Sequence, residues 1–230
     1  MTKSPSLSRY FLYEWLANPQ AQRDFLRLSY REAKLLAEEH RKPLFTDPEP
    51  RFLLCGVGAP VTARTFYLHA SSLAPGARIV LFDQRAGVLE KSVRQLAKQE
   101  TGGPARVETC VGDALQMPFA DGTFDWIETD YFLAFFRAEQ LPQLMAEWRR
   151  VLKPGGLVTT RIFAAEDSLR GRFGERCYQI YSWIISAPCH VHSVETIQAA
   201  LQSEKFTTTS RRLPTLYSRQ TMSFVAFAPK

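Results

Sequence analysis

The sequence is short of several features that mark secreted, membrane or metal-binding proteins. It has four cysteines, and no two of them form a CxxC pair. Their scatter argues against a zinc cage and against a disulfide framework, so we expect a reducing, cytoplasmic environment. The first residues lack an apolar run with a cleavage site, and nowhere do about 18 uncharged apolar residues follow one another. We therefore expect a soluble, unexported protein without a membrane partner.

The chain also lacks a concentrated basic segment, an internal repeat and a low-complexity stretch. Its 29 Lys and Arg residues exceed its 23 Asp and Glu residues, giving a formal net charge of +6. Such an excess could attract nucleic acid or an anionic substrate. The basic residues are spread along the chain, however, with only short doublets such as Arg149-Arg150 and Arg211-Arg212. Nucleic-acid binding is accordingly an unfavoured alternative.

What the chain does have is enough apolar sequence for one α/β domain with a large core: 45% of its 230 residues are hydrophobic. Residues 10–40 show helical spacing and predict an N-terminal helical cap, which the segment TDPEP at 46–50 ends. Five strand-like runs then alternate with helical patterns, at 51–58, 78–83, 105–111, 124–130 and 157–163. Strand alternating with helix is typical of a parallel sheet.

The last part of the chain predicts a helix over 193–204, with Ser193 as its N-cap, and then two consecutive strand-like runs at 206–213 and 221–228. The predicted fold class is therefore α/β, with a Rossmann-like, mostly parallel seven-stranded sheet, helices on both faces and a C-terminal antiparallel strand pair. We expect a single domain over 1–230, made of a cap (1–50), a core (51–163), an acceptor lid (164–192) and the C-terminal helix and strand pair (193–230).

One helix is marked especially clearly. Leu141, Leu144, Met145, Trp148 and Val151 have helical spacing, which predicts an amphipathic helix over 138–152. The following Lys-Pro-Gly-Gly, residues 153–156, should end that helix and release the chain into the strand at 157–163.

Candidate binding residues follow the predicted strands. In an open parallel sheet, ligands bind beyond the carboxyl ends of the strands. Gly56 and Gly58 follow the first strand, where glycine lets a ligand approach the backbone. Asp83 ends the second strand, where a carboxylate can accept hydrogen bonds from both hydroxyls of a ribose. Each feature alone also fits a structural role, as a tight turn or a helix cap.

Two further strand ends carry polar residues. Gly112-Asp113-Ala114 follows the third strand, and its carboxylate and backbone N–H can bind the amino group and ring nitrogens of adenine. Glu128-Thr129-Asp130-Tyr131 ends the fourth strand. The four strand ends together predict a nucleoside site at one edge of the sheet.

The segments LLCGVGAP, LFD, GDALQMPFADGTFDWIETD and RRVLKPGG, in this order, resemble class I S-adenosylmethionine-dependent methyltransferases over about residues 51–163. A glycine turn alone also fits a nicotinamide dehydrogenase, but the GDA and VLKPGG segments do not. The resemblance implies S-adenosylmethionine as cofactor. It implies these contacts: Gly56, Val57 and Gly58 at the methionine part, Asp83 and Gln84 at the ribose, Asp113 and the Ala114 backbone at adenine, and Thr129 near the sulfonium.

The chain departs from the family pattern at two positions. Leu54 stands where an acidic residue is common, and Pro60 stands where a third glycine is frequent. Proline suits the first turn of a helix, so Pro60 is compatible with the fold. Leu54 leaves open a second hypothesis, in which the protein binds the cofactor without using it or serves as a scaffold.

Methyl transfer from a sulfonium needs alignment and exclusion of water more than it needs catalytic groups. If the acceptor must lose a proton, Asp130, Tyr131 and His192 are the candidate bases, although each has a plain structural alternative. The crowding of Cys189, His190 and His192 in one loop lacks partners elsewhere, so no metal is expected.

The segment 164–192 is rich in aromatic residues and, with the N-terminal helices, predicts an apolar lid over the acceptor. A subunit contact through the same aromatic residues is the alternative. The sequence thus predicts an enzyme that methylates a small organic molecule. A catalytically silent cofactor-binding protein and a nucleic-acid methyltransferase are the alternatives.

Overall fold

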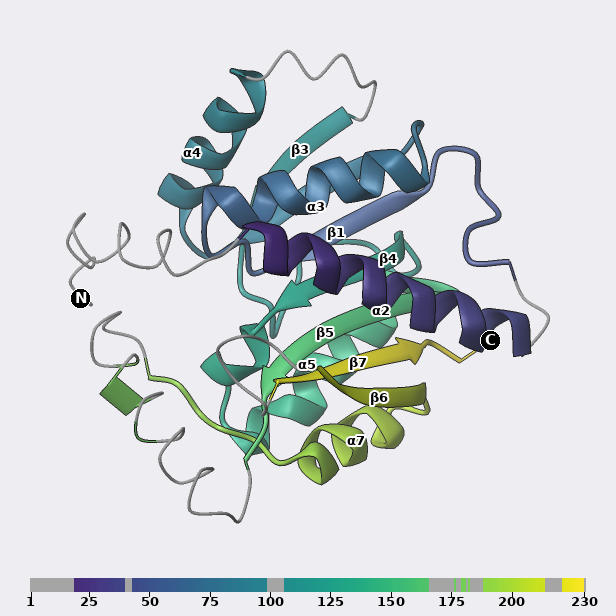
Figure 1. Cartoon of the computed structure of the whole chain (residues 1–230), viewed down its shortest axis with the longest axis vertical. Helices are drawn as coiled ribbons and strands as arrows, with labels where there is room; N and C mark the ends of the chain where they lie inside the picture. The colour runs from purple at the N-terminus through teal and green to yellow at the C-terminus, as the bar shows by residue number, and fades with distance from the viewer. Residues whose placement is uncertain are drawn as a thin grey trace.

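A computed structural model describes residues 19–39, 43–98, 106–165, 188–213 and 221–229, together with Arg176, Gln179, Ile180 and Ser182. Its centre is a seven-stranded sheet with the strand order β3-β2-β1-β4-β5-β7-β6 (Figure 1). The strands are β1 Arg51–Cys55, β2 Arg78–Asp83, β3 Arg106–Val111, β4 Phe124–Asp130, β5 Leu152–Phe163, β6 Thr207–Leu213 and β7 Thr221–Phe227. Strands β1 to β5 pair in parallel, and β7 is antiparallel to both β5 and β6. The predicted fold class is confirmed.

Helices cover both faces of this sheet (Figure 1). Helices α2 Pro19–Glu39, α3 Pro60–Leu73 and α4 Ala86–Ala97 share one core with the sheet, and α5 Leu141–Val151 and α7 Val194–Ser203 share the other. Two short 3-10 helices, η1 Phe132–Phe135 and η2 Ala138–Gln140, connect β4 to α5. The Ser193 hydroxyl accepts the N–H of Thr196 at 3.2 Å and caps α7, as predicted.

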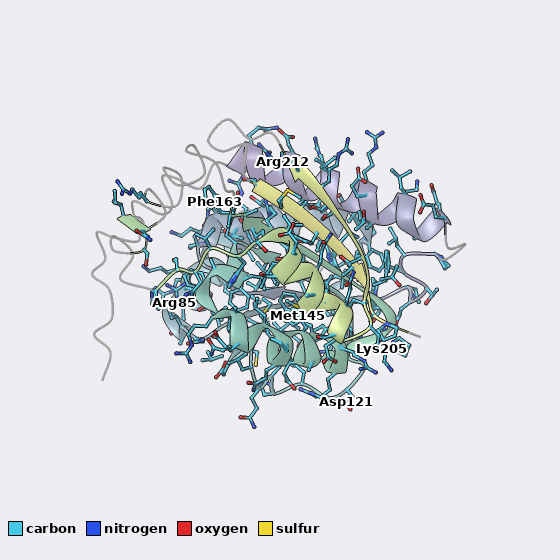
Figure 2. All side chains as sticks on the ribbon, turned by 90° about the horizontal axis from the view of Figure 1, so that it is seen from below. Arg85, Asp121, Met145, Phe163, Lys205 and Arg212 are labelled. Atoms are coloured by element: carbon cyan, nitrogen blue, oxygen red, sulfur yellow. The ribbon has the colours of Figure 1, made fainter. Side chains whose placement is uncertain are left out.

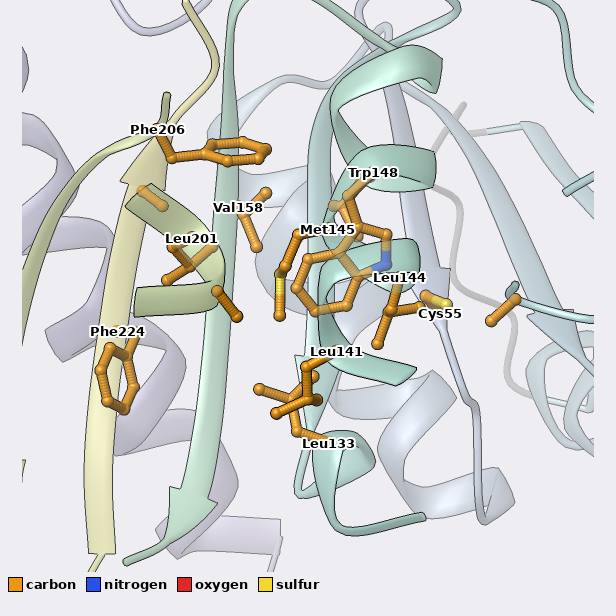
Figure 3. Packing of buried hydrophobic residues seen from close by; sticks show 14 of the residues in the cluster. Cys55, Leu133, Leu141, Leu144, Met145, Trp148, Val158, Leu201, Phe206 and Phe224 are labelled. Atoms are coloured by element: carbon orange, nitrogen blue, oxygen red, sulfur yellow. The ribbon is translucent and has the colours of Figure 1, made fainter. Parts of the chain in front are cut away.

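Helix α5 buries the apolar stripe that its spacing predicted, namely Leu141, Leu144, Met145, Trp148 and Val151. Figure 3 shows Met145 and Trp148 lying between Val158 of β5 and Cys55 of β1. Burying large apolar side chains is the main favourable contribution to folding. This packing fixes α5 against the strands whose carboxyl ends carry the candidate site.

Two predicted boundaries were wrong. The helix predicted over 138–152 begins as η2 and is α-helical only over Leu141–Val151. The following strand begins at Leu152 rather than at residue 157, and its pairing with β4 shifts between Phe124 and Trp126. The reason is Lys153, whose Nζ lies 2.8 and 3.0 Å from the two carboxylate oxygens of Asp125 and 3.2 Å from Asp47. These ion pairs hold the Lys-Pro-Gly-Gly segment beside β4.

The predicted N-terminal cap is only partly described, because residues 1–18 lie outside the described residues. Helix α2 packs against the sheet, and the Ser29 and Ser223 hydroxyls are 2.9 Å apart between α2 and β7. Most of the predicted lid over 164–192 also lies outside the described residues, so the division into cap, core and lid stays a prediction. None of the described helices combines the length and the apolar character needed to cross a membrane.

Candidate functional site

The carboxyl ends of β1 and β4 meet at the point where the strand order reverses direction, which is where ligands bind in such sheets. The turn after β1 contains two glycines in the left-handed region, Gly56 with φ 75° and Gly58 with φ 66°. The N–H of Gly56 donates to the carbonyl of Phe82 at 2.8 Å, which ties this turn to the end of β2. Val57, between the glycines, is fully buried. Glycine is required here because other residues adopt such φ angles only at a cost.

Asp83 organises the same turn from the end of β2. Its side chain is largely buried, and Oδ2 accepts the N–H of Gly58 at 3.2 Å. Oδ1 accepts both the N–H and the Nε of Arg85, at 3.0 and 3.2 Å. Gln84, the other predicted ribose contact, is exposed beside it. The carboxylate of Asp83 therefore faces the glycine turn, as expected.

The end of β3 lies next to Asp83, because the N–H of Gly112 donates to the Asp83 carbonyl at 3.3 Å. Asp113 is exposed, and one of its carboxylate oxygens accepts the N–H of Leu115 at 2.9 Å. Ala114 turns its side chain into the core. Two carboxylates, Asp83 and Asp113, thus stand at neighbouring strand ends.

At the end of β4, the residues predicted to contact the cofactor or the acceptor hydrogen-bond to neighbouring strands. Thr129 is fully buried, and its hydroxyl donates to the Thr160 hydroxyl at 2.7 Å. Tyr131 has a left-handed backbone with φ 52°, an uncommon conformation outside glycine. Its hydroxyl is 3.0 Å from that of Thr221. Burial raises the pKa of Tyr131, and the nearby Asp130 acts in the same direction, so this hydroxyl is a hydrogen-bond donor near neutral pH rather than a base.

Asp130 belongs to a buried cluster of three ionisable side chains. Arg161 of β5 lies between two carboxyls of β4: its Nη2 is 3.2 Å from Glu128 Oε1, and its Nε is 3.3 Å from Asp130 Oδ1. Thr159 donates a short hydrogen bond to Glu128 and accepts the indole N–H of Trp126 at 2.7 Å. We call Glu128, Asp130 and Arg161 the acid–arginine cluster.

Sequence reasoning missed the role of Glu128 and Arg161. Burial raises the pKa of Glu128 to about 8, although Arg161 and Thr159 act in the opposite direction. Burial thus favours the protonated form of Glu128, against the opposite effect of its two hydrogen-bond donors. A signal was present, because an arginine inside the apolar strand TTRIF requires a buried partner, but the strand register was needed to identify that partner.

His192 holds the chain around η1. Its Nε2 lies 3.2 Å from the Leu133 carbonyl and 3.0 Å from the Phe136 carbonyl, so this nitrogen is assigned the proton. Burial lowers the pKa of His192, which keeps the ring neutral. The N–H of His190 donates to the Ala134 carbonyl at 2.7 Å in the same place. His192, predicted as a candidate base, is thus placed to position the turn after β4.

The structure brings the predicted cofactor residues together at one sheet edge, and Asp130 and Tyr131 border them. Among the described residues, no group of three or more His, Cys, Asp or Glu side chains is arranged to hold a metal. A surface cavity of about 410 Å³ lies elsewhere, lined by Tyr30 and Lys34 of α2 and by the segment before β1. That cavity is at the amino ends of the strands, so we do not include it in the candidate site.

The raised pKa of Glu128 predicts a pH dependence of stability. The pKa of Glu128 is about 8 in the folded protein, above its ordinary value of 4.5. Between pH 4.5 and pH 8 the folded state therefore keeps a proton that the unfolded state loses. Stability from this group therefore falls as pH rises over that window. We expect the free energy of unfolding in urea to fall less for Glu128→Gln than for the wild type as pH rises from about 5 to about 9. The difference between the two proteins should change by at least about 1 kcal/mol in favour of the variant.

The control for this prediction is Glu90→Gln. Glu90 is exposed, and its ion pair among the described residues is with Arg94 of the same helix at 3.5 Å, so its substitution should leave the pH profile unchanged. Parallel stability curves for the wild type and Glu128→Gln across pH 5–9 would show that Glu128 is ionised in the folded protein.

Known proteins match the central part of the chain. Residues 55–160 match the model of a family described as methyltransferase domain. The ubiquinone/menaquinone biosynthesis C-methyltransferase UbiE of Paracoccus denitrificans is 37% identical over 84 residues, which are 36% of this chain and 32% of that protein. The 24-methylenesterol C-methyltransferase 2 of Oryza sativa subsp. japonica is 31% identical over 148 residues, which are 60% of this chain and 38% of that protein. The chain thus spans less than half of the length of either relative.

Solved structures show the same fold. Geranyl diphosphate C-methyltransferase from Streptomyces coelicolor A3(2) superposes with a TM-score of 0.61 at 18% identity, covering 78% of this chain and 70% of that one. Phosphoethanolamine N-methyltransferase 2 of Haemonchus contortus, in complex with S-adenosyl-L-methionine, superposes with a TM-score of 0.61 at 18% identity and covers 79% of this chain and 49% of that one. Residues 55–160 are thus similar to the methyltransferase domain family, and the chain has the fold of solved S-adenosylmethionine-dependent methyltransferases.

Proposed function

We propose that this protein binds S-adenosylmethionine and transfers its methyl group to a small organic molecule. The observation that carries the proposal is the placement of two carboxylates, Asp83 and Asp113, at neighbouring strand ends beside a left-handed glycine turn. The family match over residues 55–160 supports the same activity.

The chemistry of these residues fits an adenosyl group. Ribose hydroxyls and the adenine amino group donate hydrogen bonds, and a carboxylate accepts them. Asp113 is exposed, and only one of its oxygens is engaged by the N–H of Leu115. Asp83 is held rigidly by Gly58 and Arg85, so its orientation is set before a ligand arrives. These residues would hold the ribose and the adenine, and the backbone around Gly56 would lie beside the methionine part.

The bound cofactor supplies an activated methyl group, because its sulfur is positively charged. The protein then has to align the acceptor and exclude water. Tyr131 follows β4, and its hydroxyl, whose pKa burial raises, would orient an acceptor oxygen or nitrogen. Asp130, paired with Arg161, is the carboxylate at this end that would accept a proton from the acceptor.

The surroundings of Leu54 bear on the alternative hypothesis, in which the protein binds the cofactor but does not transfer its methyl group. Leu54 is fully buried, and Glu128 of β4 stands directly opposite it in the strand register. A carboxyl group is therefore present beside Leu54, on the neighbouring strand β4. Glu128 is, however, held by Thr159 and Arg161 and so does not take the place of an acidic residue at position 54; the silent protein stays the alternative hypothesis.

The acceptor class is proposed from the relatives and from composition. Two relatives are named as a ubiquinone/menaquinone biosynthesis C-methyltransferase and a 24-methylenesterol C-methyltransferase. The segment 164–192 is rich in aromatic residues, which as the proposed lid would suit an apolar acceptor. We therefore propose an apolar or aromatic small molecule as acceptor. The cytoplasmic location stays a prediction from the cysteine pattern.

Two measurements test the proposal. Titration calorimetry should show binding of both S-adenosylmethionine and S-adenosylhomocysteine to folded protein, and a panel of quinone, phenol and isoprenoid acceptors should yield S-adenosylhomocysteine with at least one member. Absence of heat and of thermal stabilisation with both compounds would overturn the proposal. Tight binding without product for any acceptor would favour the silent protein.

A further inference from the structure

The loop between β3 and β4 is held by side chains from one face of α5. Gln143 Nε2 donates to the Leu115 carbonyl at 3.1 Å. Glu147 Oε2 accepts the N–H of Met117 at 2.8 Å. These helix residues are four apart and Arg150 follows three later, so all three project from the same side of α5.

Arg150 makes the largest share of these contacts. Its Nη2 donates to the Met117 carbonyl at 2.9 Å, and its Nη1 donates to the Phe119 carbonyl at 2.7 Å and to Asp121 at 2.8 Å. Asp121 itself is exposed at the surface (Figure 2). The guanidinium of Arg150 thus contacts every second residue of the loop, namely Met117, Phe119 and Asp121. The ammonium group of a lysine could not bridge all three.

Glu147 holds Arg150 in the required orientation. Arg150 donates its Nε to Glu147 Oε1 and its Nη2 to Glu147 Oε2, both at 2.9 Å, which is a two-pronged ion pair. Arg150 and the Met117 N–H lower the pKa of Glu147, while Glu147 and Asp121 raise the pKa of Arg150. Both members of the pair therefore stay charged near neutral pH.

The loop held in this way begins with Asp113 and Ala114, the residues that would contact adenine. We propose that Glu147 and Arg150 are positioning residues for base recognition, because they set the path of the loop that presents Asp113 and the Ala114 N–H. The inference rests on the proposed function. It also gives a physical reason for the presence of both GDALQMPFADG and RRVLKPGG in one chain, since the arginine of the second segment holds the first.

A test compares two ligands that differ only at the base. S-adenosylhomocysteine carries the adenine amino group, and S-inosylhomocysteine carries a carbonyl oxygen in its place. We expect Arg150→Met to weaken binding of the adenine compound by about tenfold while changing binding of the inosine compound less than about twofold, because the lost contact is one to a charged acceptor. Arg150→Lys should not restore the preference, since lysine cannot bridge Met117, Phe119 and Asp121 together.

The matched control is Arg149→Met. Arg149 is the preceding residue of the same helix, but it pairs with Glu204 at 3.4 Å, and among the described residues its side chain makes no hydrogen bond or ion pair with the loop. It should leave both affinities unchanged. If Arg150→Met does not fold, Glu147→Gln offers the same comparison with a smaller change of shape.

An equal loss for both compounds, or no loss for either, would overturn the inference, because a purely structural contact does not alter the preference between the two bases. If the wild-type protein binds neither compound, the proposed function fails instead.

Discussion

Replacing Asp83 by Asn is expected to weaken the binding of S-adenosylhomocysteine about 100-fold. The Asp83 carboxylate accepts the N–H of Gly58 and two donors of Arg85, and it would also accept the ribose hydroxyls. Asparagine replaces one acceptor oxygen by an NH₂ group, which faces donors on every side. Hydrogen bonds to charged acceptors contribute about 1.5–3 kcal/mol each, and two such bonds to the ribose account for the expected loss.

Calorimetry on folded protein measures this effect, and thermal unfolding without ligand separates it from loss of structure. Asp24→Asn is the control, because Asp24 is an exposed carboxylate of α2 whose described hydrogen bonds are to Gln20 of the same helix. It should bind like the wild type. A dissociation constant for Asp83→Asn within about threefold of the wild type would mean that the ribose lies elsewhere.

Local patterns were sufficient to predict most of the fold. The runs at 78–83 and 124–130 became β2 and β4 with the predicted bounds. In β2 the residues between Arg78 and Asp83 are all apolar, as is typical of a buried parallel strand. The stripe of α5 and the Ser193 cap were equally readable, since both depend on spacing within a few residues. The candidate cofactor residues were chosen from their place after each strand, and their contacts with a cofactor stay a prediction.

Features that depend on pairing between distant segments were not predictable in the same way. Arg161 was visible as a charged residue in a strand, but its position between Glu128 and Asp130 follows from the register of β4 with β5. His192 was predicted as a candidate base, whereas its Nε2 faces the carbonyls of Leu133 and Phe136, more than 50 residues away. A loop histidine gives no sign of such partners in the sequence.

The inward face of α3 was predicted only in part. Its helical spacing predicts Val61, Thr65 and Leu68 as the inward stripe; Thr65 is buried as predicted, whereas Val61 and Leu68 are only half-buried. Ala63, Phe66 and Ala70 are buried as well. Periodicity alone favours the larger aliphatic residues. The buried face of α3 includes both small and large side chains, such as Ala63 and Phe66, and which of them face the core depends on how the helix packs against the sheet and α4.

Replacing Gly56 by Ala should have the second large effect, on stability as well as on binding. Gly56 has φ 75°, and a Cβ at this position would overlap the ring of Phe132, closer than real Cβ contacts allow. The left-handed backbone costs a residue with a side chain about 1–2 kcal/mol, and overpacking adds about 1–3 kcal/mol. We expect a loss of about 3 kcal/mol in urea unfolding and binding of S-adenosylhomocysteine weakened at least about tenfold.

The two causes can be separated by a double-variant cycle with Phe132→Ala. Removing the ring relieves the overlap but leaves the strained φ, so the two substitutions should couple by at least about 1 kcal/mol. Gly87→Ala is the control. Gly87 lies in the first turn of α4, and a Cβ at this position would have no described atom within 4 Å. Alanine there should therefore be neutral or stabilising. Additive effects of Gly56→Ala and Phe132→Ala would show that the ring does not rest on the glycine turn. Phe132 would then play no part in shaping the surface that the methionine part of the cofactor is proposed to contact.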